Sequence, residues 1–97
     1  MIVVNVYVGL LSDKIDAALA ACRTIRAVSL TEEGCESYDF FQSPDDATKL
    51  VFVEEWTSMA HLDTHFAQDA FKSFFAEMGG YMTNPPDLRI FESTKVS

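Results

Sequence analysis

The first residues of the chain constrain its fold more than any other segment. Residues 2–8 are rich in β-branched side chains, which favour an extended strand, and Gly9 ends it. Successive side chains of a strand point to opposite faces of the sheet. Apolar side chains fall on both faces of this strand: Ile2, Val4, Val6 and Val8 on one, Val3 and Tyr7 on the other. Both faces are therefore predicted to be buried, and the fold has to supply a cover on each side.

The rest of the chain alternates between helical and extended patterns. In chain order it predicts a helix over 13–30 capped by Ser12, strands over 35–42 and 50–56, a helix over 59–66 capped by Ser58, a second helical stripe, and a strand over 88–92. A turn at Pro44-Asp45-Asp46 joins the middle strands into a hairpin. The helical stripe follows a break near Gln68-Asp69, and Gly79-Gly80 ends it before Pro85-Pro86.

This order is β-α-β-β-α-β with the second helix split, which predicts one ferredoxin-like α+β domain over residues 1–97. Right-handed crossovers place the helices on one face of a four-stranded antiparallel sheet. The strand over 50–56 repeats the two-faced apolar pattern of the first strand, so the face away from the helices also needs a cover. We expect a second copy of the chain to supply it, in a homodimer with sheet-on-sheet contact.

Charge and composition exclude several classes of partner. The formal charge of −8 repels phosphate backbones and anionic lipid heads, so neither nucleic acid nor a membrane surface is an expected partner. The chain has no apolar run of the roughly 20 residues that cross a bilayer, nor the pattern of a signal peptide. Cys22 and Cys35 form no disulfide framework and are interpreted as small hydrophobes. Together these features predict a cytoplasmic protein.

Two histidines are the first candidates for chemistry. His61 and His65 are four residues apart, a spacing that can direct two imidazoles at one metal ion, but no third ligand accompanies them. No metal site is therefore expected. His65 shares a helical face with Leu62 and Phe66, and there a neutral imidazole can exchange a proton near neutral pH. The alternative is a core histidine that bonds to a backbone carbonyl.

Two adjacent carboxylates, Glu54 and Glu55, are the next candidates for chemistry. Glu54 and Glu55 lie on opposite faces of their strand, where solvation or hydrogen bonds at a dimer interface explain them better than paired acid–base catalysis. The sequence has no nucleophile motif, phosphate loop or nucleotide fingerprint. No cofactor is therefore predicted.

Aromatic side chains are abundant for a chain of this size. Rings at helical spacing belong to a core more often than to a pocket. Between a curved sheet and a broken helix, however, they can wall an apolar cavity whose few polar groups would be Asn5, Tyr38, Trp56 or His65. Such a cavity suits a flat aromatic or other hydrophobic guest. The candidate wall residues are Tyr38, Phe52, Phe66, Phe71, Phe74, Phe75 and Tyr81.

Several short motifs occur in a distinctive order. They are Glu33-Gly34-Cys35-x-x-Tyr38, then FVEEW over residues 52–56, then Ala60-x-Leu62-x-x-His65 and Phe71-x-x-Phe74. In order and spacing the chain resembles the antibiotic biosynthesis monooxygenase family over nearly its whole length. The resemblance implies a dimeric α/β barrel and, as in some members, cofactor-independent oxidation of polycyclic phenols or quinols by dioxygen.

The resemblance also implies roles for three residues. In such members an asparagine on the first strand and a tryptophan that ends the third line the cavity, at places matched by Asn5 and Trp56. A histidine on the short helix recurs and is matched by His65. These three are the candidate catalytic residues. Relatives that degrade haem carry an axial histidine where this chain has Phe75, which argues against haem.

Two classes of function follow from these observations. One is a monooxygenase acting on an aromatic or quinol-type molecule; the other is a non-catalytic dimeric module that binds a small molecule or has a structural role. A cavity above about 300 Å³ lined by Asn5, Trp56 and His65 would favour a ligand site, whereas a filled core would favour a structural module.

Overall fold

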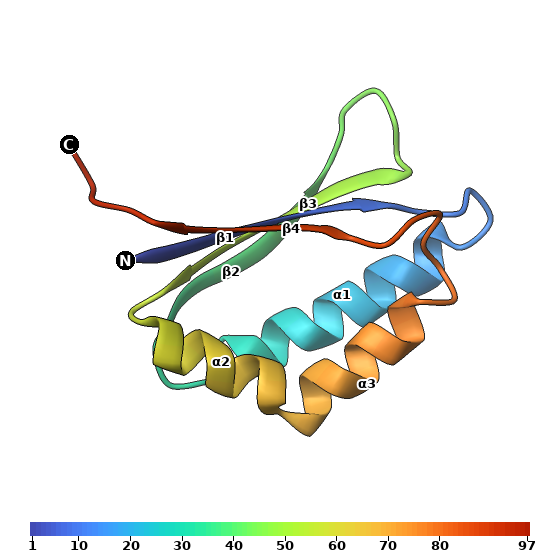
Figure 1. Ribbon diagram of the computed structural model, residues 1–97. Coiled ribbons are helices and arrows are strands. Elements are labelled where there is room, and N and C mark those ends of the chain that lie inside the picture. The colour runs from blue at the N-terminus through green and yellow to red at the C-terminus, as the bar shows by residue number, and fades with distance from the viewer.

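The computed structural model describes all 97 residues and has the predicted ferredoxin-like fold. The elements are β1 (Ile2–Gly9), α1 (Ile15–Ser29), β2 (Cys35–Gln42), β3 (Lys49–Trp56), α2 (Met59–Ala67), α3 (Asp69–Met78) and β4 (Asp87–Glu92). The four strands form one antiparallel sheet in the order β2-β3-β1-β4. The three helices cover a single face of it (Figure 1).

The local signals of the sequence explain most element boundaries. The Ser58 side chain accepts a hydrogen bond from the His61 backbone N–H and caps α2, as predicted. Gln68 adopts an extended conformation and separates α2 from α3 at the expected break. The predicted cap at Ser12 is wrong: α1 starts at Ile15, because a turn closed by the Lys14 N–H and the Leu11 carbonyl occupies the preceding residues.

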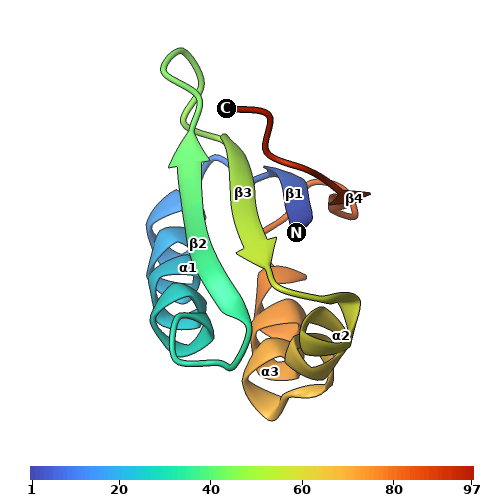
Figure 2. The same ribbon diagram turned by 90° about the vertical axis from the view of Figure 1, so that its left-hand side faces the viewer.

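The turn between β2 and β3 holds the predicted hairpin together. The Asp46 carboxylate accepts hydrogen bonds from the Thr48 backbone N–H over 3.0 Å and from its hydroxyl over 2.6 Å. This local bonding is what an aspartate contributes to a turn. Figure 2 shows the hairpin extending past the body of the domain.

The strand register divides the sheet into a helix-facing surface and an outer surface. The helix-facing surface contains buried side chains of β1, β2 and β3, and α1 packs against it through Cys22 and Ile25. The residues Ile2, Val4, Val8, Tyr38, Leu50, Phe52 and Trp56 are its buried apolar members.

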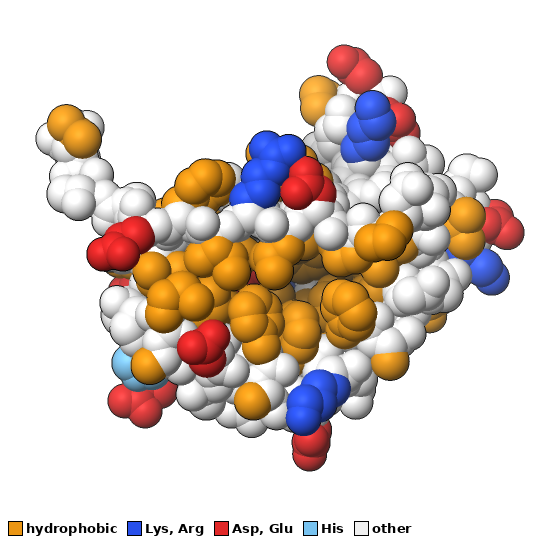
Figure 3. Space-filling model, viewed as in Figure 1, with side chains coloured by type: hydrophobic (Ala, Val, Ile, Leu, Met, Phe, Trp, Pro, Cys, Tyr) orange, Lys and Arg blue, Asp and Glu red, His pale blue; other side chains and the backbone are white.

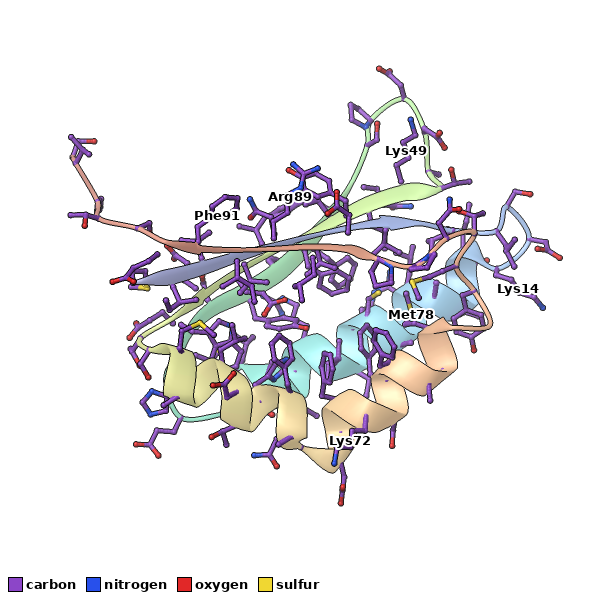
Figure 4. All side chains as sticks on the ribbon, in the orientation of Figure 1. Lys14, Lys49, Lys72, Met78, Arg89 and Phe91 are labelled. Atoms are coloured by element: carbon purple, nitrogen blue, oxygen red, sulfur yellow. The ribbon has the colours of Figure 1, made fainter.

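The outer surface bears no other part of the chain (Figure 1). Its apolar side chains alternate with the buried ones along the strands, and Tyr7, Phe41, Val53 and Phe91 among them are exposed. Figure 4 shows Arg89 and Phe91 of β4 pointing away from the helices. The helix-facing side of the sheet is thus buried as predicted, whereas the outer side is exposed in the single chain, and the homodimer that would cover it stays a prediction.

None of the three helices combines the length and the hydropathy that a membrane span requires.

Candidate functional site

An apolar pocket lies between the helix-facing surface of the sheet and α3. Its volume is about 80 Å³, and it opens on the face of the molecule seen in Figure 3, where apolar side chains surround a hollow. It is smaller than the roughly 300 Å³ at which typical ligand pockets begin, and Asn5, Trp56 and His65 do not line it, so the cavity expected as the mark of a ligand site is not found in that form. The side chains that line it are Val6, Val8, Tyr38, Phe52, Glu54, Phe66, Phe71, Phe74, Phe75, Met78, Met82, Pro86 and Leu88.

The aromatic wall consists of rings at helical spacing on α3 and of one ring near the end of α2. Phe71, Phe74 and Phe75 recur at steps of three and four residues, so their rings lie on one side of α3, toward the sheet. Phe71 packs edge-on against Phe66 of α2, with ring centroids 5.0 Å apart, and Phe74 packs edge-on against Phe52 of β3 at 6.0 Å. Figure 4 shows Met78 closing the far end of α3 against the sheet.

The pocket mouth is formed by side chains that remain partly in solvent. Phe75 is 50% exposed and Leu88 of β4 is 48% exposed, although both line the pocket. Exposed side chains change rotamer readily on the picosecond to nanosecond scale. The opening is therefore bordered by groups that can move, whereas its floor is a packed core.

Glu54 is the single carboxylate that lines this pocket. It lies on β3 between Phe52 and Trp56, on the helix-facing surface, and it is only 4% exposed. Burial raises the pKa of its carboxyl to about 7, with a further rise from the charge of Glu32, while a hydrogen bond from Trp56 lowers the pKa. Such a group changes its charge near neutral pH.

Trp56 supports Glu54 without lining the pocket. Its Nε1–H donates to Glu54 Oε1 over 3.0 Å, and the indole is completely buried. The two residues are two apart on β3, so both side chains point to the same face of the sheet. This bond satisfies the indole N–H and fixes one carboxyl oxygen.

His65 is enclosed in an aromatic cage next to the pocket. It is 1% exposed, and its ring centroid lies 4.7 Å from that of Trp56, 5.1 Å from that of Phe71 and 5.7 Å from that of Tyr38. Its Nδ1 lies 2.5 Å from Glu32 Oε1, and its buried Nε2 has no hydrogen-bond partner. A carboxylate, not a backbone carbonyl, therefore orients this ring.

Tyr38 is the other polar group of the pocket wall. It is buried, and its ring packs edge-on against Phe52 at 5.9 Å. Burial, together with the charge of Glu54, raises the pKa of its phenol well above the ordinary value. Tyr38 is thus a neutral hydroxyl at any physiological pH and can donate a hydrogen bond but not remove a proton.

The structure brings together most, but not all, of the residues predicted to form the site. Six of the seven predicted wall residues line the pocket. Tyr81 does not, because its hydroxyl donates to Glu77 Oε2 over 3.0 Å at the surface. His65 and Trp56 pack beside the pocket, behind its wall.

Asn5 departs furthest from the prediction. It pairs with Val53 of β3 and Arg89 of β4, and it alternates along β1 with the helix-facing Val4 and Val6. Its side chain therefore belongs to the outer surface, and the structure does not bring it to the pocket. Strand parity decides this, because a residue at an odd position of β1 cannot share a face with the even ones.

Glu54 is the functional residue that the sequence interpretation missed. The sequence predicts a solvated or interface carboxylate, yet Glu54 shares its strand face with Phe52 and Trp56. A carboxylate placed between two large apolar residues at a spacing of two was the available signal. Val6, Val8, Met78, Met82, Pro86 and Leu88 also line the pocket and carried no signal beyond their hydrophobicity.

The remaining candidates for chemistry are structural. No group of three or more His, Cys, Asp or Glu side chains could hold a metal ion, and His61 instead bonds through Nδ1 to Thr57 and Ser58. Both cysteines are free thiols. Burial raises the pKa of Cys22 to about 12 and that of Cys35 to about 11, so neither is a thiolate nucleophile near neutral pH.

Comparison with known proteins places this arrangement in a family. The family model named antibiotic biosynthesis monooxygenase (ABM) matches residues 1–77. This chain belongs to the ABM family. The predicted resemblance is therefore confirmed over most of the chain.

Relatives and solved structures of the ABM family agree with the fold. A Nitrosomonas europaea structure assigned provisionally to the antibiotic biosynthesis monooxygenases has a TM-score of 0.94 and 25% identity, with 98% of this chain and 100% of that chain covered. The Bacillus subtilis protein YcnE, provisionally named a monooxygenase, is 26% identical over 91% of this chain and 93% of its own length.

One relative is a longer protein. The uncharacterised Synechocystis protein sll1783 is 29% identical over 82% of this chain, but the match covers only 54% of that relative. The chain thus spans about half the length of sll1783.

Proposed function

We propose that this ABM protein is a monooxygenase that oxidises a planar phenol or quinol with dioxygen, without a bound cofactor. One observation carries the proposal: an apolar, aromatic-walled pocket contains one carboxyl group whose pKa is about 7. Membership of the family and the name of YcnE support the same class of reaction. A phenolic guest matches both features, because its ring suits the wall and its hydroxyl suits the carboxyl.

The proposed chemistry uses the substrate as the source of electrons. A base removes the phenol proton, and the ring carbon of the resulting anion adds dioxygen to form a peroxide, which is protonated to the hydroperoxide. Loss of the remaining hydrogen from that carbon breaks the O–O bond, leaving a quinone carbonyl and releasing water. Phenol and dioxygen thus give quinone and water, and each product receives one of the two atoms of dioxygen.

The size of the pocket limits how a guest can bind. Its volume of about 80 Å³ holds part of one aromatic ring, so a larger guest enters only when side chains at the mouth move. Phe75 and Leu88 are half exposed and can turn toward solvent without opening the packed core. Binding is therefore expected to reorder these two side chains.

We further propose that the protein acts as a homodimer through the outer surface of the sheet. The support is the exposed apolar row on that surface, which includes Tyr7, Val53 and Phe91. Apolar strands of this kind are normally covered on both faces. Two copies related by a two-fold axis cover the same surface on each other.

The test of the reaction is oxygen uptake with a panel of hydroquinones and polycyclic phenols. The proposal predicts one dioxygen consumed for each quinone formed, with one atom of labelled dioxygen in the quinone and no hydrogen peroxide released, at a rate that saturates with substrate. An oxygen electrode, quinone absorbance and the mass of the product measure these quantities. A protein that binds these phenols but consumes no oxygen above the spontaneous rate would instead be a binding module.

A further inference from the structure

We infer that Glu54 is the general base of the reaction and that Trp56 is its positioning residue. The reaction in this assignment rests on the proposed function, whereas the choice of Glu54 as the base rests on the geometry of the pocket. The sequence interpretation gave the proton-transfer role to His65, and the structure offers Glu54 a better position for it.

The first support is access to the guest. Glu54 lines the pocket, whereas His65 lies behind Phe66 and Phe71, which form part of the wall. A general base has to come within hydrogen-bond reach of the proton that it removes. A guest ring in the pocket would therefore be next to Glu54, while aromatic side chains would separate it from His65.

The second support is the state of the carboxyl group. Trp56 Nε1–H holds Oε1 over 3.0 Å, and the group makes no other hydrogen bond, so Oε2 is available to a guest hydroxyl. No cation neutralises it: the titratable groups that act on Glu54 or are acted on by it are Glu32, Cys35 and Tyr38. A carboxylate without an ion-pair partner keeps its basicity.

The third support is that His65 already has a hydrogen-bond partner away from the pocket. Its Nδ1 is engaged by Glu32, whose side chain is itself largely buried, and that pair lies on the side of α2 away from the pocket. Its Nε2 is buried without a hydrogen-bond partner, and the rings of Trp56, Phe66 and Phe71 pack around the imidazole. His65 thus acts as a wall support, since it fixes Phe66 and Phe71 through ring contacts at 5.6 and 5.1 Å.

Glu54 carries out each proton transfer of the proposed reaction. Its carboxylate takes the phenol proton, so the phenol O–H bond breaks and a carboxyl O–H bond forms. The proton is returned to the peroxide anion that dioxygen forms on the ring carbon. The carboxylate then removes the hydrogen of that carbon as the O–O bond breaks, and it passes this proton to the departing hydroxide as water. Glu54 ends the cycle ionised, and dioxygen is the only oxidant.

The kinetic test compares Glu54→Gln with Glu92→Gln, an equivalent change at an exposed residue outside the pocket. Loss of a general base lowers the rate by about 10²–10⁴-fold, so we expect Glu54→Gln to lower kcat by at least 100-fold and Glu92→Gln to leave it unchanged. The wild-type pH profile should rise through an inflection near 7 that Glu54→Gln lacks. A phenol already ionised at the assay pH should recover only the part of the lost rate that is due to the initial deprotonation, because the variant still lacks the base that removes the ring-carbon hydrogen.

A second readout does not depend on turnover. Bound 4-nitrophenol shows by its absorbance whether it is a phenol or a phenolate, and its blocked para position prevents oxidation there. At pH 7 the wild type should hold a smaller phenolate fraction than Glu54→Gln, because an ionised Glu54 accepts the phenol O–H and repels phenolate, whereas glutamine carries no charge.

The turnover rate and the phenolate fraction together distinguish the assignment of Glu54 as the base from the proposed oxidation. Equal phenolate fractions in the wild type and Glu54→Gln would overturn the assignment of Glu54, as would wild-type kcat in that variant. A phenolate difference without oxygen uptake by the wild type would overturn the oxidation and leave the base in place. Trp56→Phe, which removes only the N–H donor, should shift the inflection to higher pH; an unshifted profile would overturn the positioning role of Trp56.

Discussion

Trp56 Nε1 donates a hydrogen bond to Glu54 Oε1 over 3.0 Å, and both side chains are buried on the same face of β3. The pair places an ionisable group inside an otherwise apolar region, which is costly for stability unless the group has a partner or becomes neutral. Here the cost is limited by one hydrogen bond and by a pKa of about 7. Buried groups with perturbed pKa values are concentrated at functional sites, and this one lines the pocket.

The stability of the protein should depend on the charge of Glu54. Its pKa rises from an ordinary value of 4.5 to about 7 on folding, so between these values the folded state binds the extra proton. Stability contributed by this group is therefore full below pH 4.5 and falls as pH rises to 7, by about 3 kcal/mol at most. Glu54→Gln should flatten this decline. Urea unfolding of both proteins between pH 4.5 and 8 measures the difference, and parallel curves would contradict it.

His65 should be needed mainly for stability. His65→Ala removes a buried ring from the cage of Trp56 and Phe71 and leaves Glu32 without its partner, so we expect a loss of about 2–4 kcal/mol. His61→Ala is the matched control, because the His61 ring is half-buried and its loss should cost about 1 kcal/mol. Urea denaturation measures the free energy of unfolding of the two variants. Equal losses of that free energy would show that the aromatic cage around His65 is not part of the core.

Gly34 is constrained by both its backbone and its neighbour. It has a φ of +84°, and a Cβ atom there would overlap the ring of His61. Gly34→Ala should therefore lower the unfolding free energy by more than about 1 kcal/mol. Gly80→Ala is the control, since a Cβ at that position meets only ordinary contact distances. Thermal unfolding at the same or a higher temperature for Gly34→Ala would disagree with this conformation.

The fold was more predictable from the sequence than the site. The runs of β-branched and aromatic residues over 2–8 and 50–56 predicted strands, and the helical spacing of Ile15, Ala18, Cys22 and Ile25 predicted a helix, because such patterns extend over a whole element. Asn5 and Glu54 were misplaced because each role depends on which face of a strand is covered, and that is settled by tertiary packing. The pairing of Glu32 with His65 joins residues 33 positions apart, which no local pattern reveals.

The proposed dimer surface can be tested with one substitution. Val53 lies on the outer surface next to Asn5, and Val53→Asp would bury a carboxylate in a sheet-on-sheet contact. We expect the variant to be a folded monomer by light scattering and circular dichroism where the wild type is a dimer. Val96→Asp, in the fully exposed C-terminal tail, should stay dimeric. A wild-type monomer at micromolar concentration would refute the proposed interface.

Oxygen consumption by variants at the pocket mouth tests whether the reaction takes place in this pocket. Leu88 and Ile90 lie two apart on the same face of β4 and are similarly exposed, but only Leu88 lines the pocket. With the best phenol of the panel, Leu88→Trp should fill the entrance and lower kcat/KM by at least tenfold, while Ile90→Trp retains the wild-type value. Equal activity in the two variants would show that the reaction does not take place in this pocket.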